Sequence, residues 1–435
     1  MEGEFFRLPL HLPAQGAAET EATIIEWHVA EGDWFEKGQV LAQIDSAKSV
    51  FDFYAPCSGL VIRLLHVESE TVAFSESVLE IETSDPEMKS WLTSALAEAA
   101  PVKRPAPVER PIMGSEVTLL GLGGYIPERV VGNAELVRDF PQITEDYVYQ
   151  VTGIRERRWA SEQEKPSDMA YAASLDAIRA AGLPTKEIGA VIVATTTPDV
   201  AMPSTACILQ DRLNLAGIPA FDLNAACSGW LYAVGMARAM VLSGMVRNVL
   251  TVGVDLQSRL LDRTDRSATL IFGDGAGAAI ISSESRGHRI GPPLLGADTR
   301  GLTMARRGGP GYYVVNGQSG VDPWIRIDGP ALFRLATESF LDIIQRSMAN
   351  MGWTVENLRW IVPHQANGRI LRAAAKRSGM PPERFFSNME RLGNTSSASI
   401  PLALVEIGPD LRPGDRLLLC SVGAGMTTAA VPIEW

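Results

Sequence analysis

Apolar and polar positions divide the chain into two regions with different patterns. In residues 1–84, short apolar runs recur at intervals of about ten residues, separated by turn residues, which is typical of short β-strands. These runs are ATIIEWHV, VLAQI, SVFDFYA, GLVIRLLH and SVLEIET. We therefore expect residues 1–84 to form a small all-β domain, either a barrel or a flattened sandwich.

Residues 115–435 alternate between strand-like and helix-like patterns, which predicts a layered α/β fold. The expected strands include EVTLLGLGG, AVIVATTT, AFDLNAA, NVLTVGVDL and GAGAAIISS. The expected helices include SDMAYAASLDAIRAAG and GWLYAVGMARAMVLSG.

The second half of this region repeats the first at low resolution. LRWIVPHQ is similar to AVIVATTT, RFFSNMERLGNTSSASIPLAL to AFDLNAACSGWLYAVGMA, and DRLLLCSVGAGMTTAAVPIEW to RSATLIFGDGAGAAIISS. A duplicated α/β unit predicts a pseudo-symmetric five-layer αβαβα sandwich with halves at 115–288 and 289–435. Turns that follow corresponding strands would then meet at one central site.

Residues 85–114 separate the two regions. Their second half mixes Pro, Ala and charged residues, which is typical of a semi-stiff extended linker, and their first half can form one short helix. At roughly 3 Å per residue, an extended linker of this length spans about 90 Å.

Composition excludes several classes of protein. The 435 residues carry a net charge of −12, which argues against a nucleic-acid-binding protein. No apolar run is long enough for a membrane span, and the N-terminal residues do not resemble a secretory signal. The four cysteines and five histidines show neither disulfide-framework nor zinc-ligand spacing. We expect a cytoplasmic protein without a metal.

Cys227 is the first candidate for chemistry. It follows the strand pattern FDLNAA and precedes a long apolar helix. The helix dipole and free backbone N–H groups at such a position lower a thiol pKa, and the small neighbouring residues leave room for an acyl group. The alternative is a small core cysteine in a strand–helix turn.

His364 and Asn394 occupy turns that the duplicated layout brings toward Cys227. His364 ends the strand-like run RWIVPHQ, and Asn394 lies in the turn RLGNTSSAS. A thiolate can accept an acyl group, while an imidazole and an amide can hydrogen-bond a thioester oxygen as it becomes an enolate. Each polar residue could instead serve only its own turn.

Several segments of the large region resemble β-ketoacyl-acyl-carrier-protein synthase III, a member of the thiolase superfamily. They are TGIRERR (152–158), DLNAACSG (222–229), TDRSATLIFGDGAGAA (264–279), PHQANGRI (363–370), GNTSSASIPLAL (393–404) and SVGAGMTT (421–428). The resemblance implies a catalytic triad of Cys227, His364 and Asn394, with the backbone N–H groups of Cys227 and Ala424 as oxyanion hole. It also implies acyl-CoA as donor, malonyl on acyl carrier protein as extender, and a homodimer.

The same resemblance assigns substrate-binding residues. Tyr147 and Arg266 match positions at the CoA adenine, and Asn367 belongs to the substrate-binding group. Val151 stands where the family has an arginine, so a carrier-borne primer remains open. Met202 lies where the family has a bulky gate that reaches the partner subunit.

Three basic residues follow the histidine turn in the helical run GRILRAAAKRSG. Spacings of seven and eight residues place Arg369, Lys376 and Arg377 on one helix face. Such a face suits an acidic carrier protein, and the alternative is an ordinary solvated surface.

The small region resembles the lipoyl domains of 2-oxoacid dehydrogenase transacylases and related carrier proteins. Matching features are the dipeptide GD (32–33), KGQVL (37–41), an acidic residue three positions before Lys48, and the motif APCSG. Lys48 is the expected attachment residue, since Ala47 and Ser49 argue against biotin. A lipoyl group would imply a lipoylating enzyme or a 2-oxoacid dehydrogenase complex as partner. The alternative is an unmodified lysine in a domain kept for docking.

Three functions remain open at this point. The first is a condensing enzyme that forms a 3-oxoacyl-carrier protein from an acyl thioester and malonyl-carrier through acyl-Cys227. The second is a same-fold acyltransferase that delivers an acyl group to an alcohol, amine or thiol without forming a C–C bond. The third is a non-catalytic scaffold. Asn394 favours the first, because its amide can hold the decarboxylation enolate, and the intact trio argues against the third.

Overall fold

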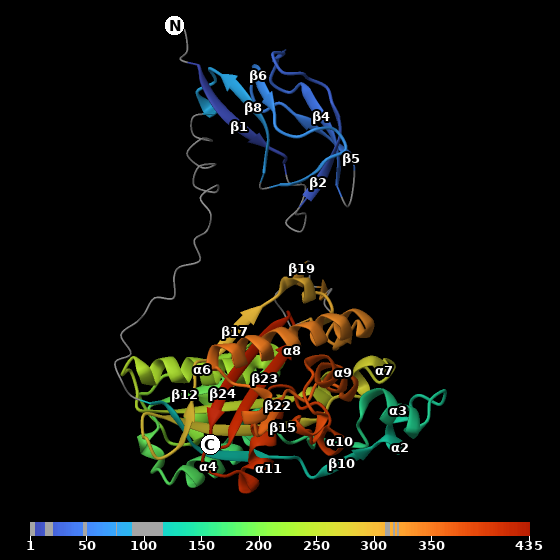
Figure 1. The fold of residues 1–435 in the computed structure, drawn as a ribbon. Helices are drawn as coiled ribbons and strands as arrows, with labels where there is room; N and C mark the ends of the chain where they lie inside the picture. Colours follow the sequence, from blue (N-terminus) through green and yellow to red (C-terminus); the bar gives the residue numbers. More distant parts are fainter. Residues whose placement is uncertain are drawn as a thin grey trace. The chain divides into compact units, whose positions relative to one another are not determined.

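The computed structural model describes residues 5–13, 21–46, 50–74, 76–88, 116–308, 314–315, 318–319 and 322–435. The chain forms two compact units, Met1–Pro111 and Ile112–Trp435, and each is described by itself (Figure 1). Lys48 and most of the expected linker lie outside the described residues. The finer boundaries at 84, 114 and 288 remain predictions.

The small unit contains two four-stranded antiparallel sheets, with strand orders β1-β8-β6-β3 and β5-β4-β2-β7. The strands are β1 (Phe6–His11), β2 (Glu21–Trp27), β3 (Trp34–Phe35), β4 (Val40–Ser46), β5 (Val50–Tyr54), β6 (Gly59–Leu64), β7 (Thr71–Ala73) and β8 (Ser77–Thr83). Apolar residues from both sheets, including Leu10, Ile24 and Ile81, form one core between them.

All five strands expected in this unit are present, and β1, β3 and β7 are additional. Strands β3 and β7 are too short to show a pattern of alternation. Strand β1 contains Pro9, which weakens a strand prediction because proline cannot donate to a ladder. It nevertheless pairs with β8 over its whole length.

The large unit is built around a ten-stranded sheet of order β13-β12-β14-β15-β9-β16-β24-β23-β22, with β17 paired to β24. Its strands are β9 (Thr118–Tyr125), β12 (Ala190–Ala194), β13 (Ala220–Leu223), β14 (Asn248–Leu256), β15 (Asp274–Ser282), β16 (His288–Ile290), β17 (Leu294–Ala297), β22 (Trp360–Pro363), β23 (Arg416–Gly423) and β24 (Thr427–Glu434). Three small ribbons pair β10 (Arg129–Gly132) with β11 (Glu156–Trp159), β18 (Ala305–Arg306) with β21 (Arg326–Ile327), and β19 (Val314–Val315) with β20 (Gln318–Ser319).

Helices cover and separate the two halves of this sheet. The α-helices are α2 (Asn133–Leu136), α3 (Glu145–Thr152), α4 (Pro166–Ala181), α5 (Thr205–Arg212), α6 (Gly229–Leu242), α7 (Arg266–Thr269), α8 (Gly329–Met351), α9 (Gly368–Ser378), α10 (Met389–Leu392) and α11 (Ser399–Ile407). The 3₁₀ turns are η1 (Thr185–Glu187), η2 (Ala226–Ser228), η3 (Gln257–Leu260), η4 (Thr299–Gly301), η5 (Val355–Asn357), η6 (Pro382–Arg384), η7 (Ser396–Ala398) and η8 (Gly408–Asp410).

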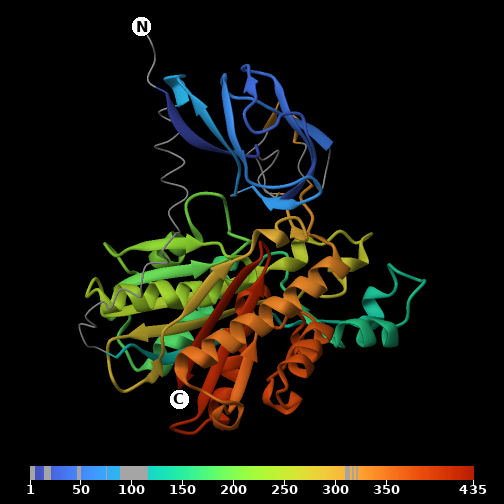
Figure 2. The ribbon, with the colours of Figure 1, turned by 45° about the horizontal axis from the view of Figure 1, so that its top comes forward.

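Three of the apolar cores in this unit lie between its five layers. One core lies between helices α4 and α5 and the first half of the sheet, and a second between helices α8 and α9 and the second half. The central core contains α6 and α11 together with strands of both halves. Successive side chains of a strand point to opposite faces of the sheet. Leu417 and Leu419 of β23 therefore face the central core, whereas Leu418 and Cys420 face the α8 side. Both views show α8 lying across β23 and β24 (Figures 1 and 2).

The expected duplication is present, with two differences from the sequence pattern. Strands β12 and β14 pair in parallel, as do β22 and β23, and each pair is followed by an antiparallel neighbour, β15 or β24. The counterpart of DRLLLCSVG is therefore β14, and the run RSATLIF instead contains helix α7. RFFSN is not a regular strand either: Phe385 forms only an isolated bridge to Ile361.

Candidate active site

A cavity of about 2520 Å³ opens in the large unit and is lined from both halves of the duplicated fold. Cys227, His364 and Asn394 all line it. The turn η2 packs against β23 of the other half, and η7 packs against β14. The turns after corresponding strands therefore meet at one place.

Cys227 lies in the turn η2 between β13 and α6, as the sequence predicts. Ala226 directly before it has a positive φ of 48°, and the Asn224 side chain accepts a hydrogen bond from the Ala226 N–H at 3.1 Å. The Ser421 hydroxyl donates to the Cys227 carbonyl at 3.1 Å, so the turn is fixed from the opposite half.

The expected lowering of the thiol pKa is wrong for this state of the protein. Burial of the sulfur raises the pKa of Cys227 to about 12, although a hydrogen bond from the Ser396 hydroxyl at 3.6 Å acts in the other direction. The buried carboxylate of Asp255 raises the pKa further. Cys227 therefore rests as a thiol, and desolvation outweighs the helix N-terminus.

His364 directly follows strand β22 and is almost completely buried. Burial lowers the pKa of His364 to about 3, so its imidazole is neutral at physiological pH. Its Nδ1 lies 2.7 Å from the Ser399 hydroxyl, which also accepts a hydrogen bond from the Gln365 N–H at 3.5 Å. The hydroxyl proton is thus available to Nδ1, which assigns the ring proton to Nε2.

The amide of Asn394 is oriented by bonds at both of its ends. Its Oδ1 accepts from the Ser396 N–H at 2.8 Å, and its Nδ2 donates to the Ala366 carbonyl at 3.2 Å. One hydrogen of Nδ2 is left for a ligand. The site therefore offers a thiol, a neutral imidazole and an amide donor.

The turn between β23 and β24 closely approaches the Cys227 turn. A Cβ atom on Gly423 would lie 2.9 Å from the Cys227 nitrogen and 3.0 Å from the Ser228 nitrogen, so only glycine fits there. Ala424 follows directly and lines the cavity. This close approach places the two N–H groups expected to form an oxyanion hole on facing turns.

Comparison with known proteins gives this geometry a family. Residues 221–299 match the family described as 3-oxoacyl-[acyl-carrier-protein] synthase III, and residues 348–435 match its C-terminal part. The β-ketoacyl-[acyl-carrier-protein] synthase III of Laribacter hongkongensis is 40% identical over 328 residues, covering 73% of this chain and 98% of that protein. The chain belongs to the 3-oxoacyl-[acyl-carrier-protein] synthase III family.

Solved structures of the synthase III family share the fold. The enzyme from Thermus thermophilus is 39% identical with a TM-score of 0.67, covering 73% of this chain and 99% of that one. The priming β-ketosynthase from the R1128 polyketide biosynthetic pathway is 34% identical with a TM-score of 0.70, covering 75% and 98%. Residues 9–81 match a different family, described as biotin-requiring enzyme, so the small unit is of the biotinyl/lipoyl type.

The residues expected at the CoA adenine lie together at the cavity wall. The Arg266 guanidinium is 5.9 Å from the centre of the Tyr147 ring, and both residues line the cavity. Val151 also lines it, and its carbonyl accepts from the Asn367 side chain at 3.4 Å. Asn367 caps helix α9 through the Arg369 N–H, so its side chain has a structural role as well.

Helix α9 exposes the three basic residues predicted for carrier docking, Arg369, Lys376 and Arg377. Arg372, which the sequence reading missed, is exposed on the same face three residues after Arg369. None of the four has an ion-pair partner within the part of the chain that the structure describes.

Sequence reasoning also missed Ser396 and Ser399, the hydroxyls that contact Cys227 and His364. Both stand in the run NTSSAS, and a serine there reads as an ordinary helix-start residue. In the described ranges, no group of three or more acidic, His or Cys side chains is placed to hold a metal ion. None of the described helices combines the length and apolar character that a bilayer crossing needs.

Proposed function

We propose that the large unit catalyses a decarboxylative Claisen condensation between an acyl thioester and malonyl-carrier protein, yielding a 3-oxoacyl-carrier protein. The observation that carries this proposal is the convergence of Cys227, His364 and Asn394 on one cavity, with hydrogen-bond donors facing it. Membership of the synthase III family supports it.

In the first half-reaction, Cys227 attacks the carbonyl of the acyl thioester. The backbone N–H groups of Cys227 and Ala424 stabilise the tetrahedral oxyanion. The carbon–sulfur bond of the donor then breaks, and the leaving thiol takes the proton that Cys227 loses. Because Cys227 rests as a thiol, this proton leaves during the attack.

In the second half-reaction, malonyl-carrier loses CO₂ and its bonding electrons move onto the thioester carbonyl as an enolate. The Nε2–H of neutral His364 and the Nδ2–H of Asn394 donate to the enolate oxygen. The enolate carbon attacks acyl-Cys227, a C–C bond forms, and the cysteine sulfur leaves and regains a proton.

Incubation with malonyl-carrier and a series of acyl-CoAs, followed by mass spectrometry of the carrier and CO₂ measurement, tests this function. Condensation yields CO₂ and a 3-oxoacyl-carrier. Acyl transfer to an alcohol, amine or thiol without CO₂ release would instead support the same-fold acyltransferase. An unacylated Cys227 with every donor would support the scaffold.

We further propose that Lys48 carries a lipoyl group that primes Cys227. Asp45 of β4 pairs with Val50 of β5, and Lys48 lies between these two residues in the sequence. The side chains of Asp45 and Val50 are exposed, which leaves this end of the hairpin accessible to a modifying enzyme. A lipoyl group would be held in amide linkage to Lys48, and its reduced dihydrolipoyl form would supply a thiol that can hold an acyl group as a thioester.

Priming from Lys48 suits a site where Val151 replaces a CoA-binding arginine. Tethering on a linker of about 30 residues raises the local concentration of the arm to roughly millimolar. The intact mass of protein from cells with active lipoylation tests the modification. Absence of a lipoyl group on Lys48 in such protein contradicts the proposed attachment. If the group is present, a Lys48→Arg variant with unchanged priming from every donor defeats the delivery role.

We propose that an acidic carrier protein docks on the exposed basic face of α9, and that the large unit forms a homodimer. Strand β13 stands first in the strand order, so one of its edges lacks a strand partner within the described chain. Met202 is 84% exposed, as expected of a residue that reaches another subunit. Light scattering should give twice 47.0 kDa, and a monomer mass contradicts the dimer.

A further inference from the structure

Arg307 is an unpaired cation in the wall of the cavity that contains Cys227. Its side chain is partly buried, and it makes no hydrogen bond or ion pair with any residue in the part of the chain that is described. Burial lowers the pKa of Arg307, but a guanidinium remains charged at neutral pH. A partly desolvated charge without a partner is unfavourable, so the site favours an anionic ligand.

The carboxylate whose charge acts on Arg307 is already fully used by other groups. Asp255 is completely buried. Its Oδ1 accepts from the Thr196 N–H at 2.7 Å and the Thr196 hydroxyl at 2.8 Å. Its Oδ2 accepts from the Ser397 N–H at 3.1 Å and hydroxyl at 2.8 Å. Asp255 therefore fixes two turns of the fold and does not hold the Arg307 guanidinium.

The cavity wall next to Asp255 is polar as well. Thr196 and Gln257 both line the cavity, and the Gln257 Nε2 donates to the Thr196 hydroxyl at 2.8 Å. Gln257 is 5% exposed, so its amide is part of a built surface and not a mobile surface group. This part of the wall presents hydrogen-bonding groups, with which an unsubstituted alkyl chain cannot form hydrogen bonds.

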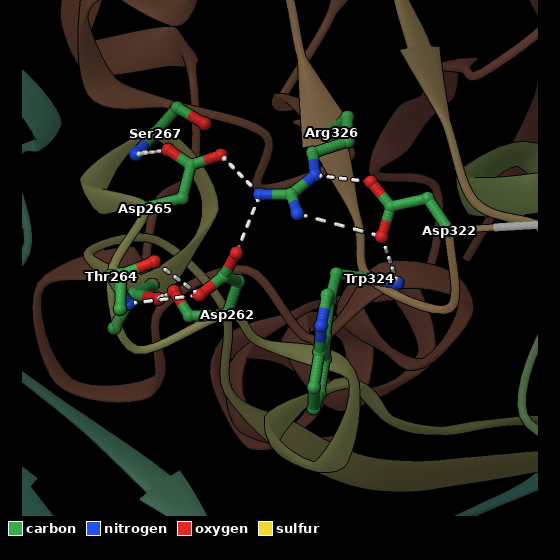
Figure 3. A network of polar contacts seen from close by, with 8 residues as sticks. Asp262, Thr264, Asp265, Ser267, Asp322, Trp324 and Arg326 are labelled. Carbon is green, nitrogen blue, oxygen red and sulfur yellow. Dashed lines mark hydrogen bonds and ion pairs between the residues drawn. The ribbon is translucent and has the colours of Figure 1, made fainter.

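The segment that carries Arg307 is held in a defined position. Ala305 and Arg306 pair with β21, and the Gly308 N–H donates to the Asp322 carbonyl at 2.9 Å. On β21, the Arg326 guanidinium lies between Asp262 at 2.7 Å, Asp265 at 3.2 Å and Asp322 at 2.5 Å (Figure 3).

Arg326 and Arg307 thus differ sharply, although Arg326 lies in β21 and Arg307 directly follows β18, the strand paired with β21. Arg326 has three carboxylate partners, whereas Arg307 has none within the described ranges. Arg307 is held in position by its backbone, lines the reaction cavity and has no partner among the described residues. Such a cation can form an ion pair with an anionic group of a ligand.

We propose that Arg307 selects the primer, and that the preferred primer is a thioester whose acyl chain carries a carboxylate, as in an ω-carboxyacyl group. The guanidinium would pair with this carboxylate while the thioester carbonyl lies at Cys227. This inference rests on the proposed acylation of Cys227 and assigns its substrate class.

The test measures acylation of Cys227 by intact mass over time, using pairs of acyl-CoAs matched in length, butyryl against succinyl and hexanoyl against adipoyl. No malonyl-carrier is present, so the carboxylate of the extender cannot contribute. The unmodified protein should accept the carboxylated member faster. Arg307→Met should slow the carboxylated member by roughly 10- to 100-fold and leave the methyl-ended member unchanged, which also shows that the variant is folded.

Two further variants sharpen the result. Arg307→Lys keeps the charge without the planar fork and should retain part of the preference. Arg306→Met removes the adjacent exposed cation and should leave the ratio between the two primers unchanged.

Four outcomes overturn the inference. Equal acylation by both members in the unmodified protein removes the selectivity. An equal loss for both members in Arg307→Met assigns the cation to the CoA phosphates, which every primer shares. Acylation by other thioester donors but by neither member overturns the inference alone. If no thioester donor acylates Cys227, the proposed function is overturned, and the inference is overturned with it.

Discussion

The two strand–turn–helix units of the large unit share one backbone conformation at the turn but differ in the side chains that follow it. In both, an asparagine accepts a hydrogen bond from the N–H two residues ahead, Asn224 from Ala226 and Asn394 from Ser396. In both, that following residue has a positive φ, 48° for Ala226 and 52° for Ser396. Duplication has preserved a turn that holds a side chain at the start of a central helix.

The next position separates the two turns. Ser397, the counterpart of Cys227, donates to Asp255 and to the Ala194 carbonyl and is fully enclosed. Cys227 instead lines the cavity, and its turn lies so close to Gly423 that a side chain there would clash with the Cys227 nitrogen. One turn is satisfied by the protein, and the other is open to a substrate.

The strand ends differ in the same way. In the first half, Ala194 lies against Gly229, where an added Cβ would stand 3.1 Å from the alanine methyl group. In the second half, the corresponding pair is His364 and Ser399, joined at 2.7 Å. The apolar pair only packs, whereas the polar pair presents an oriented imidazole. The site thus needs both halves, because each supplies what the other lacks.

Removing the nucleophile should have the largest effect of the variants that test this difference between the two turns. Cys227→Ala should abolish the acyl-enzyme on intact-mass analysis and lower condensation by roughly 10³-fold or more. The counterpart Ser397→Ala loses hydrogen bonds to Asp255, so it should lower stability by about 1 kcal/mol and still acylate. Persistent acylation in Cys227→Ala would move the assignment to Cys420, which is fully buried and contributes nothing to the cavity wall.

Substituting the second-half donors should separate the two half-reactions. His364→Ala and Asn394→Ala should each lower CO₂ release from malonyl-carrier by about 10²- to 10³-fold, because each removes a donor to the enolate oxygen. Acylation of Cys227 should remain largely intact. Asn224→Ala is the matched variant, since it loses the same turn hydrogen bond, and it should disturb acylation more than CO₂ release. Loss of both half-reactions in the Asn394 variant would indicate a structural role.

The sequence predicts the fold and the convergence of the three turns because both follow from local patterns. Continuous runs of apolar and small residues show β12, β14 and β15, and the repeat shows that their counterparts end at the same centre. The pKa of Cys227 could not be read in this way. A helix start suggests a lowered value, but the actual value depends on how completely other segments bury the sulfur.

The role proposed for Arg307 could not be predicted from the sequence either. Nothing in the run MARRGG distinguishes Arg307 from Arg306, and two adjacent arginines usually indicate a solvated turn. Both residues line the cavity, and only the folded structure shows that Arg306 is exposed whereas Arg307 is partly buried. The role of a charged residue depends on its neighbours in space, and these can lie far away in the sequence.

Alkylation of the resting cysteine tests how strongly burial controls it. Because the pKa of Cys227 is raised to about 12, the thiolate fraction is small at pH 7 and grows about tenfold per pH unit through pH 9. The rate of iodoacetamide modification, followed by mass in a Cys207→Ser background that removes an exposed thiol, should rise with that slope. The pKa of His364, near 3, predicts no additional step between pH 6 and 7. A rate already constant at pH 7 would contradict a buried thiol.

The smallest expected effect concerns the hydroxyl that distinguishes the His364 pair from the Ala194 pair. Ser399→Ala removes the donor to Nδ1, so the proton of the neutral ring is no longer fixed on Nε2, and the enolate loses its aligned donor in part of the molecules. CO₂ release should fall by roughly five- to tenfold in kcat with little change in KM, and acylation of Cys227 should not change. Ser399→Thr keeps the hydroxyl and should restore most of the rate, which a purely structural role for the serine would not require. An equal loss in the alanine and threonine variants would show that the site depends on the small volume of Ser399 and that its hydrogen bond to His364 has no part in positioning the ring.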